Sequence, residues 1–250
     1  MSEINISLEG GASKRLLTAG KYCDRDIIVT AEAGKLPTDL LALRLNNALK
    51  EYTSEEVVYV GNYAFWSVNS LESINLPNCK EVTTACFQNC KSLKTASFRS
   101  CTIAGGTVFR GCSSLLNVNF PILEYTSTYI FAECSALERI VLPKVKQLGG
   151  AAFHTCTSLQ FVDLPSVTSV GAMAFQNCSL LTTVIIRQDQ TICTLAATTA
   201  FTGTPIADGT GFIYVPSSRL STFKSASNWS AYADQIRAIE DYPEICGVTE

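Results

Sequence analysis

The sequence predicts a solenoid of stacked coils, because three residue types recur at one fixed interval. Phenylalanine occurs at six positions that lie 22 residues apart, leucine follows each phenylalanine by six residues, and cysteine follows all but the first by three. Such a period is typical of repeat proteins, in which like residues stack from one coil to the next. The three columns are Phe65, Phe87, Phe109, Phe131, Phe153 and Phe175; Leu71, Leu93, Leu115, Leu137, Leu159 and Leu181; and Cys90, Cys112, Cys134, Cys156 and Cys178.

Each coil contains the pattern of one short strand. In the segment Leu159-x-x-Val162-x-Leu164, the alternation predicts that Val162 and Leu164 point inward and that the residue between them points outward. Proline follows this segment in four coils and ends the strand, because proline cannot donate to a strand ladder. Glycines such as Gly149 and Gly171 mark bends that need positive φ or close backbone approach. We therefore predict mostly short parallel β-strands joined by turns.

The full repeat resembles a known family. The pattern Leu-x-x-Val/Ile-x-Leu-Pro-x-Val-x-x-Val-Gly-x-x-Ala-Phe-x-x-Cys-x-x-Leu is similar to the BspA-type leucine-rich repeats of bacterial surface proteins, over roughly residues 57–192. The resemblance implies a curved right-handed solenoid that presents a parallel strand face. It also implies binding and adhesion rather than chemistry, and it specifies no ligand.

Four regions follow from the change of pattern along the chain. Residues 1–34 are expected to form a small β module, and residues 35–56 a capping helix from 40 to about 50 with the entry to the solenoid. About six coils of 22 residues occupy 57–192. Residues 193–250 are expected to form a C-terminal cap with a strand at 212–215 and a helix after Pro216, because a terminal coil would otherwise expose its apolar face. Helical caps are thus expected at both ends.

Composition excludes several function classes. The net charge is −3, which gives no electrostatic support for binding nucleic acid. No apolar run is long enough for a membrane span, so membrane insertion is not expected. The first residues lack the basic and apolar regions of a secretory signal. Two settings stay open, namely the cell surface that the resemblance implies and a virion.

Cysteine and histidine indicate neither a metal site nor an active site. The chain has 11 cysteines, and the five in the repeat column should stack one strand spacing apart, ~4.8 Å, which does not suit a tetrahedral metal site. These cysteines are expected to be buried apolar residues. The single histidine, His154, has no suitable nucleophile and orienting partner, and no phosphate-binding loop is present. We expect no catalytic residue, no metal and no cofactor, and hence no enzyme.

Outward strand positions are the candidate ligand contacts. In the C-terminal half, Val141, Phe161 and Ile185 should form an exposed apolar patch with Arg139 and Asp163 at its edge. The alternative is that this surface is only a solvated strand face or is covered by the C-terminal cap. The outward columns are Ser73, Thr95, Asn117, Arg139, Phe161 and Thr183, and Asn75, Ser97, Asn119, Val141, Asp163 and Ile185.

Two functions are compatible with these observations. The first is a non-enzymatic adhesion protein that recognises a protein or glycan on a cell surface through its strand face. The second is a phage or prophage virion component, such as a tail-fibre or receptor-binding protein. The second is favoured by the missing signal and by a phrase at 17–30 that is similar to a short module of phage structural proteins from Gram-positive gut bacteria. A monomer fits the first function and a trimer the second.

Overall fold

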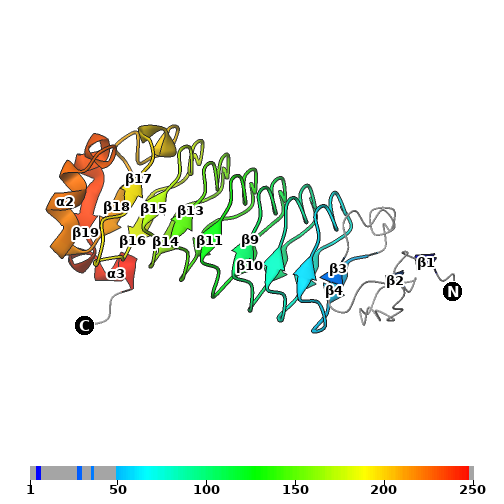
Figure 1. The fold of residues 1–250 in the computed structure, drawn as a ribbon. Helices are drawn as coiled ribbons and strands as arrows, with labels where there is room; N and C mark the ends of the chain where they lie inside the picture. Colours follow the sequence, from blue (N-terminus) through cyan, green and yellow to red (C-terminus); the bar gives the residue numbers. More distant parts are fainter. Residues whose placement is uncertain (1–3, 7–26, 30–34, 37–48, 248–250) are drawn as a thin grey trace.

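The computed structural model describes residues 4–6, 27–29, 35–36 and 49–247. From residue 49 onward the chain winds through successive coils that follow one another along a single axis and end in a helical C-terminal region (Figure 1). Within the predicted β module, β1 (Ile4–Ile6) and β2 (Ile27–Val29) pair in parallel. The helix predicted over 40–50 falls almost entirely outside the described residues.

The longer strands of the coils form one side of the solenoid, which we call the strand face. Neighbouring repeat strands pair in parallel and in register, so that residue 73 lies beside residue 95, and residue 139 beside residue 161. The first group is β4 (Glu51–Thr53), β6 (Ser73–Asn75), β8 (Thr95–Ser97) and β10 (Asn117–Asn119). The second is β12 (Arg139–Val141), β14 (Phe161–Leu164), β16 (Thr183–Ile186), β18 (Phe212–Val215) and β19 (Ile236–Ala238).

A second sheet, the return sheet, runs without interruption through eight strands of two residues each. The repeat pattern placed the solenoid at residues 57–192. The two sheets extend beyond this range, because β3 and β4 precede residue 57 and β17 and β18 follow residue 192. The return sheet comprises β3 (Lys35–Leu36), β5 (Tyr59–Val60), β7 (Glu81–Val82), β9 (Ile103–Ala104), β11 (Tyr125–Thr126), β13 (Gln147–Leu148), β15 (Ser169–Val170) and β17 (Thr194–Leu195).

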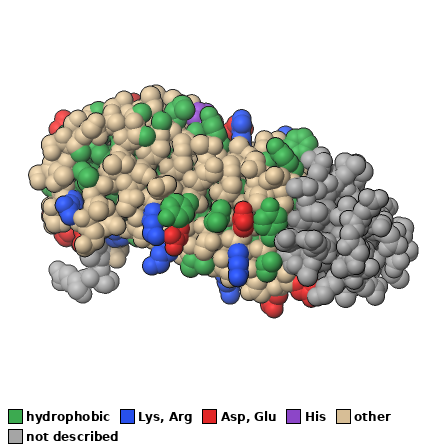
Figure 2. All heavy atoms as spheres, in the orientation of Figure 1, with side chains coloured by type: hydrophobic (Ala, Val, Ile, Leu, Met, Phe, Trp, Pro, Cys, Tyr) green, Lys and Arg blue, Asp and Glu red, His purple; other side chains and the backbone are tan. Residues whose placement is uncertain are grey.

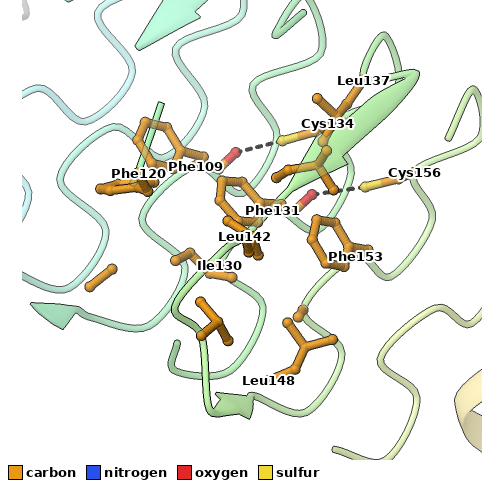
Figure 3. Packing of buried hydrophobic residues seen from close by; sticks show 14 of the residues in the cluster. Phe109, Phe120, Ile130, Phe131, Cys134, Leu137, Leu142, Leu148, Phe153 and Cys156 are labelled. Atoms are coloured by element: carbon orange, nitrogen blue, oxygen red, sulfur yellow. Dashed lines mark hydrogen bonds between the residues drawn. The ribbon is translucent and has the colours of Figure 1, made fainter. Parts of the chain in front are cut away.

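The phenylalanine column forms the centre of the core. All six predicted rings are fully buried, and neighbouring ring centroids lie 5.1–5.6 Å apart with interplanar angles of 3–21°. Figure 3 shows three of them, Phe109, Phe131 and Phe153. The leucine column is likewise fully buried. One coil cannot bury its own apolar side, so each ring is covered only when the coils on both sides are folded.

The cysteine column is buried as expected and also links the coils by hydrogen bonds. Each column thiol donates to the carbonyl oxygen of the phenylalanine 25 residues earlier, with sulfur–oxygen distances of 2.9–3.2 Å. The same carbonyl also accepts a backbone N–H from its own coil, as Phe109 O does from Cys112 N at 3.0 Å. The phenylalanine–cysteine spacing therefore places the two donors on each carbonyl, which has two lone pairs. Every described cysteine is free.

Two turn positions in each coil have left-handed backbone geometry without requiring glycine. One column of φ values between 53° and 58° contains Tyr63, Ala85, Thr107, Tyr129, Ala151 and Met173.

The predicted bend glycines have another role, which is close approach between coils. A Cβ on Gly149 would lie 2.2 Å from Ser127 O, and one on Gly171 would lie 2.5 Å from Gly150 N. Of the two reasons proposed for these glycines, close backbone approach is the correct one.

The C-terminal region covers the last coil. Phe201 continues the ring column, with its ring centroid 5.3 Å from that of Phe175, although it follows Phe175 by 26 residues instead of 22. The extra residues of this coil lie in the segment after β16 and do not disturb the stacking. Trp229 packs against Phe201 and donates its indole N–H to Cys193 O at 2.6 Å. The helical elements are η1 (Thr198–Phe201), η2 (Ser217–Arg219), α2 (Leu220–Ser225), η3 (Trp229–Gln235), η4 (Ile239–Asp241) and α3 (Pro243–Cys246).

Candidate functional site

The outward columns of the strand face differ between the two halves of the solenoid. Thr95, Asn117 and Asn119 are exposed in the N-terminal half, and Arg139 and Val141 are exposed at its boundary with the C-terminal half. Beyond that boundary exposure falls: Phe161 and Thr183 are half-buried, and Asp163 and Ile185 are buried. The accessible strand face is therefore mainly polar and uncharged.

The exposure expected for Ile185 and Asp163 is wrong. Ile185 is fully buried and Asp163 is 8% exposed. The physical reason is that residues 239–246 fold back over β14, β16 and β18, which brings Ile239 and Cys246 onto Ile185. This small cluster also contains Tyr214, with Phe161, Phe212 and Tyr242 packed against it. The C-terminal region thus covers part of the apolar surface that was predicted to bind a ligand.

An ion pair fixes this covering segment. Arg187 donates to both carboxylate oxygens of Asp163 at 2.8–3.1 Å, and it donates to Cys246 O in α3 at 2.5 Å. Arg187 stands where other coils have the strand-ending proline. The cap removes the Asp163 carboxylate from water, and burying an unpaired charge is energetically costly. The Arg187 guanidinium offsets this cost by pairing with the carboxylate.

A slot divides the strand face between β10 and β12. These neighbouring coils have no strand pairing on this side, so the four-stranded and five-stranded sheets are separate. On the other side, β11 pairs with both β9 and β13, and in the core the rings of Phe109 and Phe131 stack at 5.6 Å. The solenoid is therefore continuous behind the slot, and only the strand face opens.

The slot holds a cavity of about 360 Å³. Its polar side chains are Asn117, Asn119 and Arg139, and the other lining residues are Val118, Phe120, Pro121, Ile140, Val141 and Pro143. A mixture of a few polar groups with apolar walls is typical of small-molecule sites. On the face of the molecule that Figure 2 shows, hydrophobic and charged side chains of the described residues lie in small groups.

Arg139 is the charged group of this cavity. Its guanidinium carbon lies 3.8 Å from the centre of the Phe161 ring, a cation–π contact that holds the plane of the guanidinium. Arg139 has no ion pair within the part of the chain that the structure describes, because Asp163 is taken up by Arg187. The amide of Asn119 donates to Ser97 Oγ at 3.4 Å, which leaves the amide oxygen as an acceptor.

Groups with potential for metal binding or catalysis do not gather here. Across the described residues, no three His, Cys, Asp or Glu side chains are placed to hold a metal ion. His154 lies on a turn, where Nδ1 is 2.9 Å from Thr155 Oγ1 and the ring meets the edge of Tyr129. No helix within the described ranges is long and apolar enough to span a membrane.

Sequence reasoning identified Arg139 and Val141 at this site but not the slot itself. Asn117 and Asn119 were recognised as outward residues, yet nothing in the repeat pattern set them apart. One core column changes from the stacked Phe98 and Phe120 to Leu142 at the slot, but it also changes from Leu76 to Phe98 where β6 and β8 pair, so side-chain size in this column does not predict the slot.

The fold and the strand face define the class of protein. A stack of coils with this leucine spacing and a parallel strand face is a leucine-rich repeat protein. The family model for the BspA-type leucine-rich repeat region matches six copies over residues 46–144 and 124–207. The chain belongs to this family.

Solved structures of bacterial leucine-rich repeat proteins share the fold. A leucine-rich repeat protein of Eubacterium ventriosum matches with a TM-score of 0.56 and 22% identity over 62% of this chain and 43% of that one. A leucine-rich repeat protein of Bacteroides ovatus matches with a TM-score of 0.55 and 24% identity over 76% of this chain and 57% of that one. The pneumococcal vaccine antigen PcpA matches with a TM-score of 0.51 and 16% identity over 76% of this chain and 54% of that one. The chain spans about half the length of these proteins. A search of curated protein sequences gives no match.

Proposed function

We propose that the chain is a non-enzymatic adhesion protein that binds a protein or glycan of a cell surface through its strand face. The observation that carries this proposal is the slot, where exposed polar side chains surround a cavity on an otherwise continuous solenoid. The family supports it as well, because its repeats are typical of surface and binding proteins. The similarity to a pneumococcal vaccine antigen supports a place outside the cell.

The strand face is suited to binding because its side chains are held in fixed rows. Parallel pairing spaces equivalent residues by ~4.8 Å, and short polar residues such as Asn and Thr lose little conformational entropy when a ligand immobilises them. Outward residues on the return sheet are also exposed, and Ile103 and Tyr125 lie side by side there. The return sheet, however, is unbroken through its eight strands, whereas the strand face opens at the slot.

The virion alternative stays a prediction. It depends on the phrase at 17–30, most of which lies outside the described residues, and on no feature of the strand face.

The test compares the two sheets. Beads coated with the chain are counted on immobilised cell-surface glycans and glycoproteins, with Thr95→Arg as the strand-face variant and Tyr125→Arg as the return-sheet control. Both positions are exposed. We expect Thr95→Arg to reduce capture about tenfold, as for a central interface residue, and Tyr125→Arg to leave it unchanged. Loss of capture with Tyr125→Arg alone would overturn the proposal.

A further inference from the structure

We propose that the slot between β10 and β12 binds the carboxylate of an acidic sugar, such as a uronic or sialic acid residue. The inference rests on the proposed binding function and specifies the ligand class of its site. Three features of the slot lead to it: its size, its single positive charge and the pairing of amides with apolar walls.

The size of the cavity favours one sugar residue over a peptide. A volume of about 360 Å³ is near the lower end of the ~300–1,000 Å³ of small-molecule sites. A peptide that adds a strand needs a longer free edge, and β10 and β12 have only three residues each. The coils on either side limit the slot along the axis of the solenoid.

The charge of the slot selects an anion. Arg139 is the one charged side chain that lines the cavity, and it has no ion pair within the described residues. The neighbouring carboxylate, Asp163, is already neutralised by Arg187 at 2.8 Å. The ring of Phe161, in β14 on the other side of β12 from the slot, covers one face of the guanidinium and fixes its plane, so the N–H donors at the guanidinium edge are the ones left to pair with a carboxylate. The site is positive although the chain as a whole carries a net charge of −3.

The remaining lining residues match a sugar ring. Asn117 supplies an amide with a donor and an acceptor, and Asn119, whose N–H donates to Ser97 Oγ, supplies an amide oxygen as an acceptor; these are groups that sugar hydroxyls require. Val118, Val141 and Pro143 supply apolar surface for the C–H side of the ring. A carboxylate, neighbouring hydroxyls and an apolar ring face occur together in an acidic sugar.

The experiment measures binding of methyl glycosides by titration calorimetry and saturation-transfer NMR. The probes are the methyl glycosides of glucuronic acid and N-acetylneuraminic acid, with methyl glucoside as the neutral control. The variants are Arg139→Gln and Arg139→Lys. Arg110→Gln is the matched control, because Arg110 also lies over an aromatic ring, that of Tyr129 at 5.6 Å, but is already paired with Glu133 at 2.8 Å.

We expect the intact chain to bind an acidic glycoside and not methyl glucoside. Arg139→Gln should weaken binding about 10- to 100-fold, which is the loss of a charge-assisted hydrogen-bonded pair. Arg139→Lys should retain part of the affinity, and Arg110→Gln should retain all of it. Affinity should fall as salt is added, because the charge is exposed. A urea unfolding curve for each variant shows that the fold is retained.

The outcomes separate this inference from the proposed function. If the chain captures neutral glycans or proteins in a manner sensitive to Thr95→Arg, but binds neither acidic glycoside, the acidic-sugar inference is overturned and the strand-face function stands. Equal affinity of Arg139→Gln and the intact chain for an acidic glycoside would also overturn the inference. If Thr95→Arg alters no capture and no glycoside binds, both are wrong.

Discussion

The ring column should determine both the stability and the cooperativity of the solenoid, and Phe131→Ala tests this. Phe131 is fully buried and stacks on Phe109 at 5.6 Å and on Phe153 at 5.3 Å. Removing a buried phenylalanine leaves a cavity and costs about 3–5 kcal/mol. For a slope of about 3 kcal/mol per molar urea, the unfolding midpoint should fall by roughly 1–2 M.

The same variant should uncouple the two ends of the solenoid. Because each coil contacts only its neighbours, weakening one interface in the middle lets the C-terminal coils unfold separately. The chain has tryptophan only at 66 and 229, and Trp229 is buried in the C-terminal cap. In a Trp66→Phe background, fluorescence reports the C-terminal end and circular dichroism reports all coils. We expect the two midpoints to coincide before Phe131→Ala is introduced and to separate afterwards.

Tyr125→Ala is the matched control for this experiment. Tyr125 belongs to the same coil and is 45% exposed, so its removal should change the free energy of unfolding by no more than about 0.5 kcal/mol. A loss for Phe131→Ala as small as that for Tyr125→Ala would refute the role of the ring column. Coincident midpoints after a full loss of about 3–5 kcal/mol would refute nearest-neighbour coupling.

Three further predictions concern the turns, the cap and the thiols. Gly149→Ala should lower the free energy of unfolding, measured in a thermal melt, by more than about 2 kcal/mol, because the new Cβ would lie 2.2 Å from Ser127 O. The control Gly106→Ala, whose new Cβ would lie 3.5 Å from its nearest neighbour, should change it by no more than about 0.5 kcal/mol. Arg187→Ala should lower the free energy of unfolding by about 3 kcal/mol and should make one more thiol per chain, that of Cys246, reactive toward a thiol reagent. An unchanged number of reactive thiols would contradict the described role of the ion pair. Burial raises the pKa of several core thiols from 9.0 to about 12, so the stability they contribute is complete below pH 9 and is lost as pH rises toward 12. At about 1.4 kcal/mol per pH unit for each thiol, the thiols of Cys79, Cys86, Cys90 and Cys193 alone should lower the free energy of unfolding by about 6 kcal/mol at pH 10. A flat pH profile in urea titrations would contradict this.

Most of the solenoid could be predicted because its pattern is local and periodic. The burial of each Phe, Leu and Cys column follows from one coil copied many times, and each residue meets its own equivalent. The thiol hydrogen bonds were not foreseen, although the constant spacing of Phe131 and Cys134 was the visible sign of them. Hydropathy alone does not distinguish a buried thiol that donates from one that only fills space.

The candidate site was predicted less well because it depends on contacts outside the period. Arg187 and Cys246 are 59 residues apart, and no repeat relates them, so the covering of Ile185 could not be read from the strand alternation. The slot depends on small differences between neighbouring coils, which a consensus pattern removes. Arg139 lies at the place where both effects meet, between the open slot and the covered strands.

The rule that each coil bonds only to its neighbours has a consequence for how such chains change length. A carbonyl such as Phe109 O takes one donor from its own coil and one from the next, so an inserted copy brings its own partners and needs none from afar. The repeat is thus a unit that duplication can add or deletion can remove without redesign of the rest. The slot shows that one junction can lose its strand pairing on the strand face while the return sheet behind it stays continuous, so a change at one junction does not require a change at the others.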